Sequence, residues 1–207
     1  MNILMGWLDK PKISGEFNKR VKLPYGITIE DIRFAMEFVY DVLRTLNVAL
    51  AKRVGSRLEE IMRPNSFPDL LSTLVVRGIS THSNSVTYNR KHDGFPDLLP
   101  VCDEYENIGY YVHQGVGVEI KASKQKGGWQ GHNPEEGWLM VFIYEIDRKT
   151  EPKEYRTPTK FIEVLAAKLT KEDWSYSGRR PGSRRTITAS VNKNGVQKMR
   201  KNWIYRE

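Results

Sequence analysis

The sequence predicts a mixed α/β protein in which a helical N-terminal third precedes a mixed central sheet flanked by helices. Apolar residues recur at spacings of three and four between residues 28 and 55, which is typical of an amphipathic helix. They alternate with polar residues at 116–121, as in a half-buried strand, and residues 138–146 form a nearly unbroken apolar run typical of a central strand. At 207 residues, we expect a single domain.

Two helices are predicted before residue 64. Thr28 is a suitable N-cap, acidic residues follow it in the first turn, and Gly55 is suited to end the long helix. Ser56 is a candidate cap for a shorter helix that stops at Pro64.

The segment Phe-Pro-Asp-Leu-Leu occurs twice, at residues 67–71 and 95–99. The first copy predicts a helix capped by Ser66 and ended by Gly78. The second copy predicts a short strand, because Pro100 prevents a helix. No other part of the two neighbourhoods matches, so we interpret the echo as coincidence and not as a repeat.

The C-terminal half predicts further strands. Residues 159–169 fit either a helix or a strand, with strand slightly favoured, and RTITASV at 185–191 indicates a strand. Residues 194–203 predict a short terminal helix, and the stretch before Gly26 reads as irregular or edge structure.

The positive charge is concentrated at the C-terminal end. The chain carries a net charge of +8, and residues 171–207 hold ten Lys and Arg against three Asp and Glu, or +7 of that total. Such a segment suits either a polyanion-binding surface or a basic solubilising tail. We therefore divide the domain into a mainly helical part (1–80), a sheet part (81–170) and a basic segment (171–207).

Several classes of protein are excluded or disfavoured. The chain has no apolar run of membrane-spanning length and no signal-peptide pattern, which predicts a cytoplasmic protein without a membrane partner. Its single cysteine, Cys102, allows no internal disulfide and no multi-thiolate zinc site. The four histidines have no metal-binding spacing, and phosphate-loop and dinucleotide motifs are missing from the sequence.

The strongest chemical pattern consists of Asp97, Glu119 and Lys121. Glu119 and Lys121 are two residues apart on a predicted strand, so they leave the same face, opposite Val118 and Ile120. With Asp97 on a neighbouring strand, two carboxylates and the backbone carbonyl of Ile120 form the oxygen set that Mg²⁺ prefers. The alternative is that Glu119 and Lys121 lie on the exposed, cross-strand-paired face of an edge strand.

Pro96-Asp97 followed by Glu119-Ile120-Lys121 resembles the motif of the PD-(D/E)XK nuclease superfamily, which includes type II restriction endonucleases. The resemblance covers residues 93–145. It implies an αβββαβ core and cleavage of DNA that depends on Mg²⁺, for which Mn²⁺ can substitute. It also implies that Asp97 and Glu119 bind the metal and that Lys121 positions or activates the attacking water.

The resemblance leaves two points open. Many enzymes of the group place a further acid on the first core helix, and Glu37, Glu59 and Glu60 are the candidates here, with the shorter helix favouring the last two. The family core also has a helix after the catalytic strands, where residues 159–169 are ambiguous.

Two further segments are candidates for DNA contacts. The loop after the Glu119 strand and the arginine-rich segment near the C-terminus carry side chains that can bind phosphates or base edges. The candidates are Lys124, Lys126, Trp129, Gln130, His132, Asn133, Arg179, Arg180, Ser183, Arg184, Arg185 and Thr186. An ordinary surface loop and a basic tail are the alternatives, and we interpret Trp174, Trp203 and Tyr205 as core anchors.

The sequence thus leads to the hypothesis of a Mg²⁺-dependent endonuclease that hydrolyses duplex DNA as a type II restriction enzyme. A homodimer is expected because two-fold symmetry matches palindromic DNA, and a cognate DNA methyltransferase encoded nearby is an expected partner. The alternatives are a repair or junction-resolving nuclease with the same core and a DNA-binding protein without catalytic activity.

Overall fold

The computed structural model describes residues 6–91, 94–101, 116–131, 133–176 and 189–207. Its helices are α1 (Ile29–Val54), α2 (Leu58–Ile61), α3 (Ser66–His82) and α5 (Lys193–Lys201), with short 3-10 turns at Gly6–Leu8, Lys153–Tyr155 and Lys171–Asp173. Each of these helices is too short or too polar to cross a bilayer.

The strands form two sheets. The large sheet has seven strands in the order β1 (Glu16–Phe17), β10 (Trp203–Arg206), β7 (Lys160–Leu169), β6 (Gly137–Glu145), β4 (Val118–Ser123), β3 (Leu98–Pro100) and β2 (Val86–Tyr88). The small sheet has three, in the order β5 (Gln130–Gly131), β9 (Ala189–Val191) and β8 (Trp174–Tyr176). All neighbours are antiparallel except β4 and β6, which are parallel.

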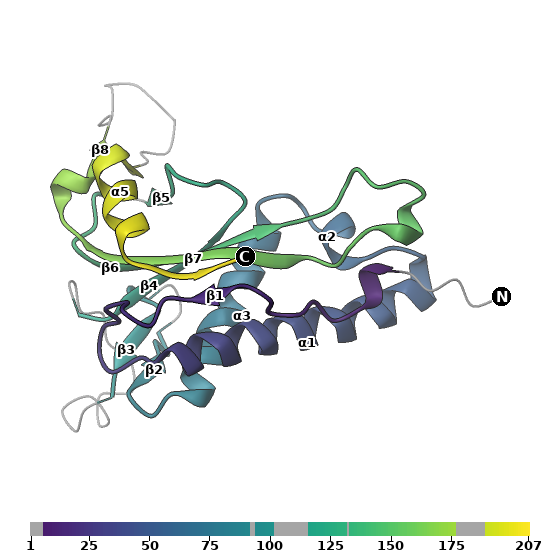
Figure 1. Ribbon diagram of the computed structural model, residues 1–207, viewed down its shortest axis with the longest axis horizontal. Helices are drawn as coiled ribbons and strands as arrows, with labels where there is room; N and C mark the ends of the chain where they lie inside the picture. The colour runs from purple at the N-terminus through teal and green to yellow at the C-terminus, as the bar shows by residue number, and fades with distance from the viewer. Residues whose placement is uncertain (1–5, 92–93, 102–115, 132, 177–188) are drawn as a thin grey trace.

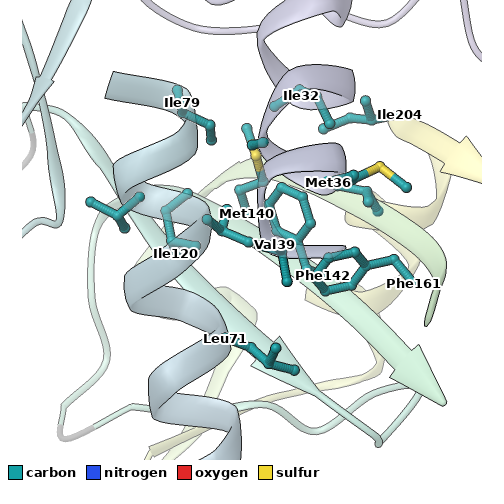
Figure 2. Close-up of a cluster of buried hydrophobic side chains, with 14 of the residues drawn as sticks. Ile32, Met36, Val39, Leu71, Ile79, Ile120, Met140, Phe142, Phe161 and Ile204 are labelled. Atoms are coloured by element: carbon teal, nitrogen blue, oxygen red, sulfur yellow. The ribbon is translucent and has the colours of Figure 1, made fainter. Parts of the chain in front are cut away.

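Two layers of side chains cover the large sheet, and the predicted mixed α/β class is confirmed. Figure 1 shows α1 and α3 along one face, and α5 with the small sheet on the other. Figure 2 shows the first of the two cores, where the helices contribute Ile32, Met36, Val39, Leu71 and Ile79 and the strands contribute Ile120, Met140, Phe142, Phe161 and Ile204. β6 serves both cores, because Met140 and Phe142 face the helices while Leu139 and Val141 face the small sheet.

The long helix agrees with the prediction at both ends. The Thr28 hydroxyl accepts a hydrogen bond from the Asp31 N–H at 3.1 Å, and the Asp31 carboxylate accepts one from the Thr28 N–H at 2.8 Å. Gly55 follows the helix in the left-handed conformation, with φ of 62°. A capping box and a left-handed glycine therefore set its length.

The boundaries of the next two helices differ from the prediction. Arg57, not Ser56, precedes α2, because the Ser56 hydroxyl donates to Glu60 instead. Asn65, not Ser66, precedes α3, and α3 continues through Gly78 to His82. Gly78 does not end the helix.

Gly78 permits a close contact between helices. A Cβ atom at this position would lie 2.7 Å from the Cα of Ala35 in α1. Backbone cannot give way as a flexible side chain does, so the residue must be small for α1 and α3 to pack at this separation.

We expect Gly78→Ala to destabilise the protein by about 1–3 kcal/mol, although alanine favours helix formation. The cause is the overlap with Ala35, which forces the two helices apart. Urea unfolding measures the effect, and Thr73→Ala, an exposed change on the same helix, is the control. A Gly78→Ala variant as stable as wild type would contradict the packing argument.

The C-terminal region departs from the expected αβββαβ order. Residues 160–169 are strand β7, as slightly favoured, so they are not the helix that the resemblance implies after the catalytic strands. β4 and β6 are instead joined by a segment that carries β5, and its described residues contain no helix. The terminal helix is confirmed, but it ends at Lys201 and β10 follows, which the sequence did not predict.

Candidate active site

Asp97 and Glu119 meet where β3 and β4 begin to pair. Leu98 of β3 is opposite Val118 of β4 in an antiparallel pair. Asp97, just before Leu98, therefore lies beside Glu119, just after Val118. Gly117 allows this approach, because a Cβ there would lie 2.2 Å from the Leu98 carbonyl oxygen, and its φ is 113°. The predicted pairing of the Pro-Asp strand with the Glu-Ile-Lys strand is therefore confirmed.

Asp97 is held by backbone hydrogen bonds on both sides. Its Oδ2 atom accepts a hydrogen bond from the Ile120 N–H at 2.8 Å, and its carbonyl accepts one from the Asn89 N–H at 2.8 Å. In a strand, the N–H and C=O of one residue point to the same edge. The Ile120 carbonyl therefore points to the edge where the Asp97 carboxylate lies.

Glu119 and Lys121 share one face of β4, as predicted from their spacing. Lys121 Nζ donates to Glu119 Oε1 at 3.1 Å, and the side chains of Lys121 and Glu119 are 23% and 18% exposed. β4 lies between β3 and β6, so it is not an edge strand. The alternative of a solvated face on an edge strand is wrong.

The pKa values of Asp97 and Lys121 are both raised in the site. Burial, the charge of Glu119 and a hydrogen bond with Glu119 raise the pKa of Asp97 to about 7, although the Ile120 N–H opposes the shift. For Lys121, burial lowers the pKa, but the charge of Glu119 and its hydrogen bond outweigh this and raise it overall. Lys121 is thus an ammonium at neutral pH.

We expect Asp97→Asn to stabilise the metal-free protein at pH 8 but not at pH 4. Because the pKa of Asp97 is raised, the folded protein keeps a proton that the unfolded chain loses between about pH 4 and 7. This contribution to stability is complete below pH 4 and is lost as the pH rises through 7. An amide does not titrate, so the free energy of unfolding of Asp97→Asn should exceed that of wild type by about 2 kcal/mol at pH 8.

Urea unfolding in EDTA at both pH values tests this prediction. Glu37→Gln, the same chemical change on an exposed residue of α1, is the matched control. An equal effect of Asp97→Asn at pH 4 and pH 8 would show that the titration of Asp97 is not its cause.

The donor set at this position fits a divalent cation. Asp97 and Glu119 supply carboxylates within hydrogen-bonding reach of one another, and the Ile120 carbonyl points to the same edge. Oxygen ligands of this kind suit Mg²⁺, which keeps several waters in its shell. No three His, Cys, Asp or Glu side chains come together to hold a metal in the described ranges, so the described side-chain ligands would be these two carboxylates.

A cavity of about 490 Å³ opens at this site and brings in a residue that the sequence analysis did not assign. Its lining includes Asp97, Glu119 and Lys121 on the sheet and Asp69 at the start of α3. The remaining lining residues are Asn65, Pro68, Ser72, Ile120, Ala122, Ser123, Gln125, Trp129 and Gln130. Both Phe-Pro-Asp-Leu-Leu segments therefore supply their aspartate to one cavity, although one is a helix and the other a strand.

The three candidate acids that precede Asp97 in the sequence, Glu37, Glu59 and Glu60, are not among the residues that line this cavity. Glu59 is 1% exposed and accepts hydrogen bonds from Thr159 Oγ1 at 2.6 Å and Asn47 Nδ2 at 3.2 Å. Glu60 binds two arginines, and Glu37 is exposed on α1. Glu59 and Glu60 hold α2 in place, so the structure does not support them as members of the site.

Only some of the residues predicted to contact DNA lie in the part of the chain that the structure describes. Gln130 and Trp129 line the cavity, Lys124 and Lys126 are exposed beside it, and Asn133 is exposed outside its lining. His132 and the arginine-rich residues Arg179, Arg180, Ser183, Arg184, Arg185 and Thr186 lie outside the described residues. Trp174 and Tyr205 are buried and Trp203 is half-buried, which confirms them as packing residues.

Comparison with protein-family models and with curated proteins gives no match.

Proposed function

We propose that the protein is a Mg²⁺-dependent endonuclease that hydrolyses phosphodiester bonds in duplex DNA, of the type II restriction kind. The observation that carries the proposal is the close placement of Asp97, Glu119 and Lys121, with the Asp97 pKa raised by Glu119 and burial. Two carboxylates that repel one another, with one ammonium beside them, are well suited to a divalent cation. Mg²⁺ bound there would stabilise developing charge on the phosphodiester and make a neighbouring water more acidic.

The protein residues have separate roles in this proposal. Asp97 and Glu119 hold the cation, and the Ile120 N–H fixes the orientation of the Asp97 carboxylate. Lys121 remains protonated, so it donates hydrogen bonds that orient the attacking water and offset charge on the phosphate. Asp69 also lines the cavity, where its carboxylate would repel phosphates and favour placement of the DNA backbone near Lys121.

The resemblance to PD-(D/E)XK nucleases is limited to part of the fold. The pairing of β3 with β4 supports the resemblance, while the described residues between β4 and β6 contain no second helix. A homodimer and a cognate methyltransferase remain parts of the proposal, because a restriction enzyme must cut both strands and its host DNA must be protected.

Plasmid cleavage tests the proposal. Wild-type protein should give discrete fragments with Mg²⁺ and none with EDTA, and Asp97→Ala and Glu119→Ala should give none in either condition. Lys168→Ala is the control and should cut normally, because Lys168 is an exposed residue of β7 without an ion pair in the described part of the chain. Cleavage unchanged in Glu119→Ala would refute the site, and binding without cleavage under any divalent metal would favour a non-catalytic protein. Preference for branched DNA would favour a junction-resolving enzyme.

A further inference from the structure

The backbone of residues 124–130, which lead from β4 into β5, is fixed by one hydrogen bond within the segment and by two with the C-terminal part of the chain. The Gln125 carbonyl accepts a hydrogen bond from Trp129 Nε1 at 2.9 Å, and the Lys126 carbonyl accepts one from Arg200 Nη2 at 3.0 Å. The Val191 N–H donates to the Trp129 carbonyl at 2.9 Å. Trp129 is only 2% exposed, so its indole anchors the loop in the second core.

Two side chains of this rigid loop are free. Gln125 and Gln130 are exposed, and within the described ranges their side-chain amides make no hydrogen bond. The backbone of Gln130 pairs with Ser190 in the small sheet, and the Gln125 N–H donates to Ser123 Oγ at 3.0 Å, so both backbones are held while both side chains reach the cavity. That cavity is the one lined by Asp97, Glu119 and Lys121.

We infer that Gln125 and Gln130 read an A·T base pair next to the cleaved phosphate. This inference rests on the proposed nuclease function and names the substrate feature that the site selects. A carboxamide offers one acceptor and donors in one plane, which matches N6 and N7 of adenine in the major groove. Lysines bind phosphates regardless of sequence, whereas amides discriminate base edges, and Lys124 and Lys126 flank Gln125 with the charge needed for the backbone.

The anchored backbone explains why two exposed side chains can be selective. A loop that is ordered before binding loses little conformational entropy when the DNA arrives. It also holds the backbone of both glutamines at a fixed distance from Glu119 and Lys121, so their amides reach a base in one register with the cut. Side chains on an unanchored loop would contact neighbouring base pairs indifferently.

The experiment measures cleavage of a pool of duplexes randomised around the cut by wild type and by Gln125→Ala/Gln130→Ala. Wild type should prefer A·T over G·C at one position near the cut by about tenfold or more, and the double variant should lower this ratio to below about twofold. At that position, 7-deazaadenine, which lacks N7, should slow wild type about tenfold and leave the double variant unaffected. Gln197→Ala, an exposed glutamine of α5, is the matched control and should keep the wild-type ratio.

Failure of this inference is distinct from failure of the proposed function. A double variant that cleaves with the wild-type ratio overturns the base-reading role and leaves the nuclease proposal intact. Complete lack of cleavage by wild type contradicts the nuclease proposal instead. In that case the same pool is bound in Ca²⁺ without cleavage, and loss of an A·T preference in the double variant supports base reading while an unchanged profile overturns it.

Discussion

Lys121→Met is expected to slow the cleavage of DNA by about three orders of magnitude while leaving Mg²⁺ binding almost unchanged. Methionine keeps the length and the apolar stem of the side chain, so the change removes little except the ammonium group. That group is 3.1 Å from Glu119 Oε1 and has a raised pKa, which places a permanent positive charge beside the proposed metal. The loss should therefore appear in the rate of the chemical step.

Single-turnover cleavage with excess enzyme and titration calorimetry with Mg²⁺ separate the two effects. Lys168→Met on β7 is the matched control and should cleave at the wild-type rate. Lys121→Arg should recover part of the activity, because it restores the charge with a different shape. A rate for Lys121→Met within threefold of wild type would show that Lys121 is not used in the reaction.

Arg57→Ala is expected to lower the free energy of unfolding by about 3–5 kcal/mol. The Arg57 side chain is completely buried and connects α2 to the segment between β6 and β7. Its Nη1 donates to the Thr157 carbonyl at 3.0 Å, its Nη2 donates to the Asp147 carbonyl, and its Nε donates to Glu60 at 3.1 Å. Removing the guanidinium takes the Arg57 donor from both carbonyls, breaks one of the two arginine contacts of Glu60 and leaves a cavity where the buried side chain was.

Urea unfolding monitored by circular dichroism measures the change. Arg53→Ala is the control, because Arg53 is exposed in the last turn of α1 and should change stability by less than about 0.5 kcal/mol. Arg57→Lys should recover little, since one ammonium cannot reach three acceptors placed around a planar fork. A loss below 1 kcal/mol for Arg57→Ala would mean that water replaces the missing donors.

The sequence predicted the elements that follow from local pattern and missed those set by packing. Thr28 and Gly55 bound α1 as expected, because capping depends on neighbouring residues alone. Gly78 has the local pattern of a helix end, but the reason for a glycine there is the contact with Ala35, which is far away in sequence. β10 was missed because a four-residue strand between β1 and β7 has no periodicity long enough to detect.

In the candidate site too, local pattern predicted some residues and packing determined the others. Spacing alone placed Glu119 and Lys121 on one face of a strand, and the Pro-Asp dipeptide at the next strand supplied Asp97. Asp69 and Gln125 reach the cavity only because α3 starts beside the end of β4 and because Trp129 anchors the loop. Neither arrangement has a local signal, although the repeated Phe-Pro-Asp-Leu-Leu segment marked both aspartates that line the cavity.

The inner position of β10 constrains the order in which the sheet is assembled during synthesis. β1 pairs with β10 in the sheet, so β1 cannot join the sheet until residues 203–206 have been synthesised. β3, β4, β6 and β7 can pair before that point, because all their partners precede residue 170 except β10, which pairs with β7. The strands that carry the cavity can thus pair with one another before β1 joins the sheet.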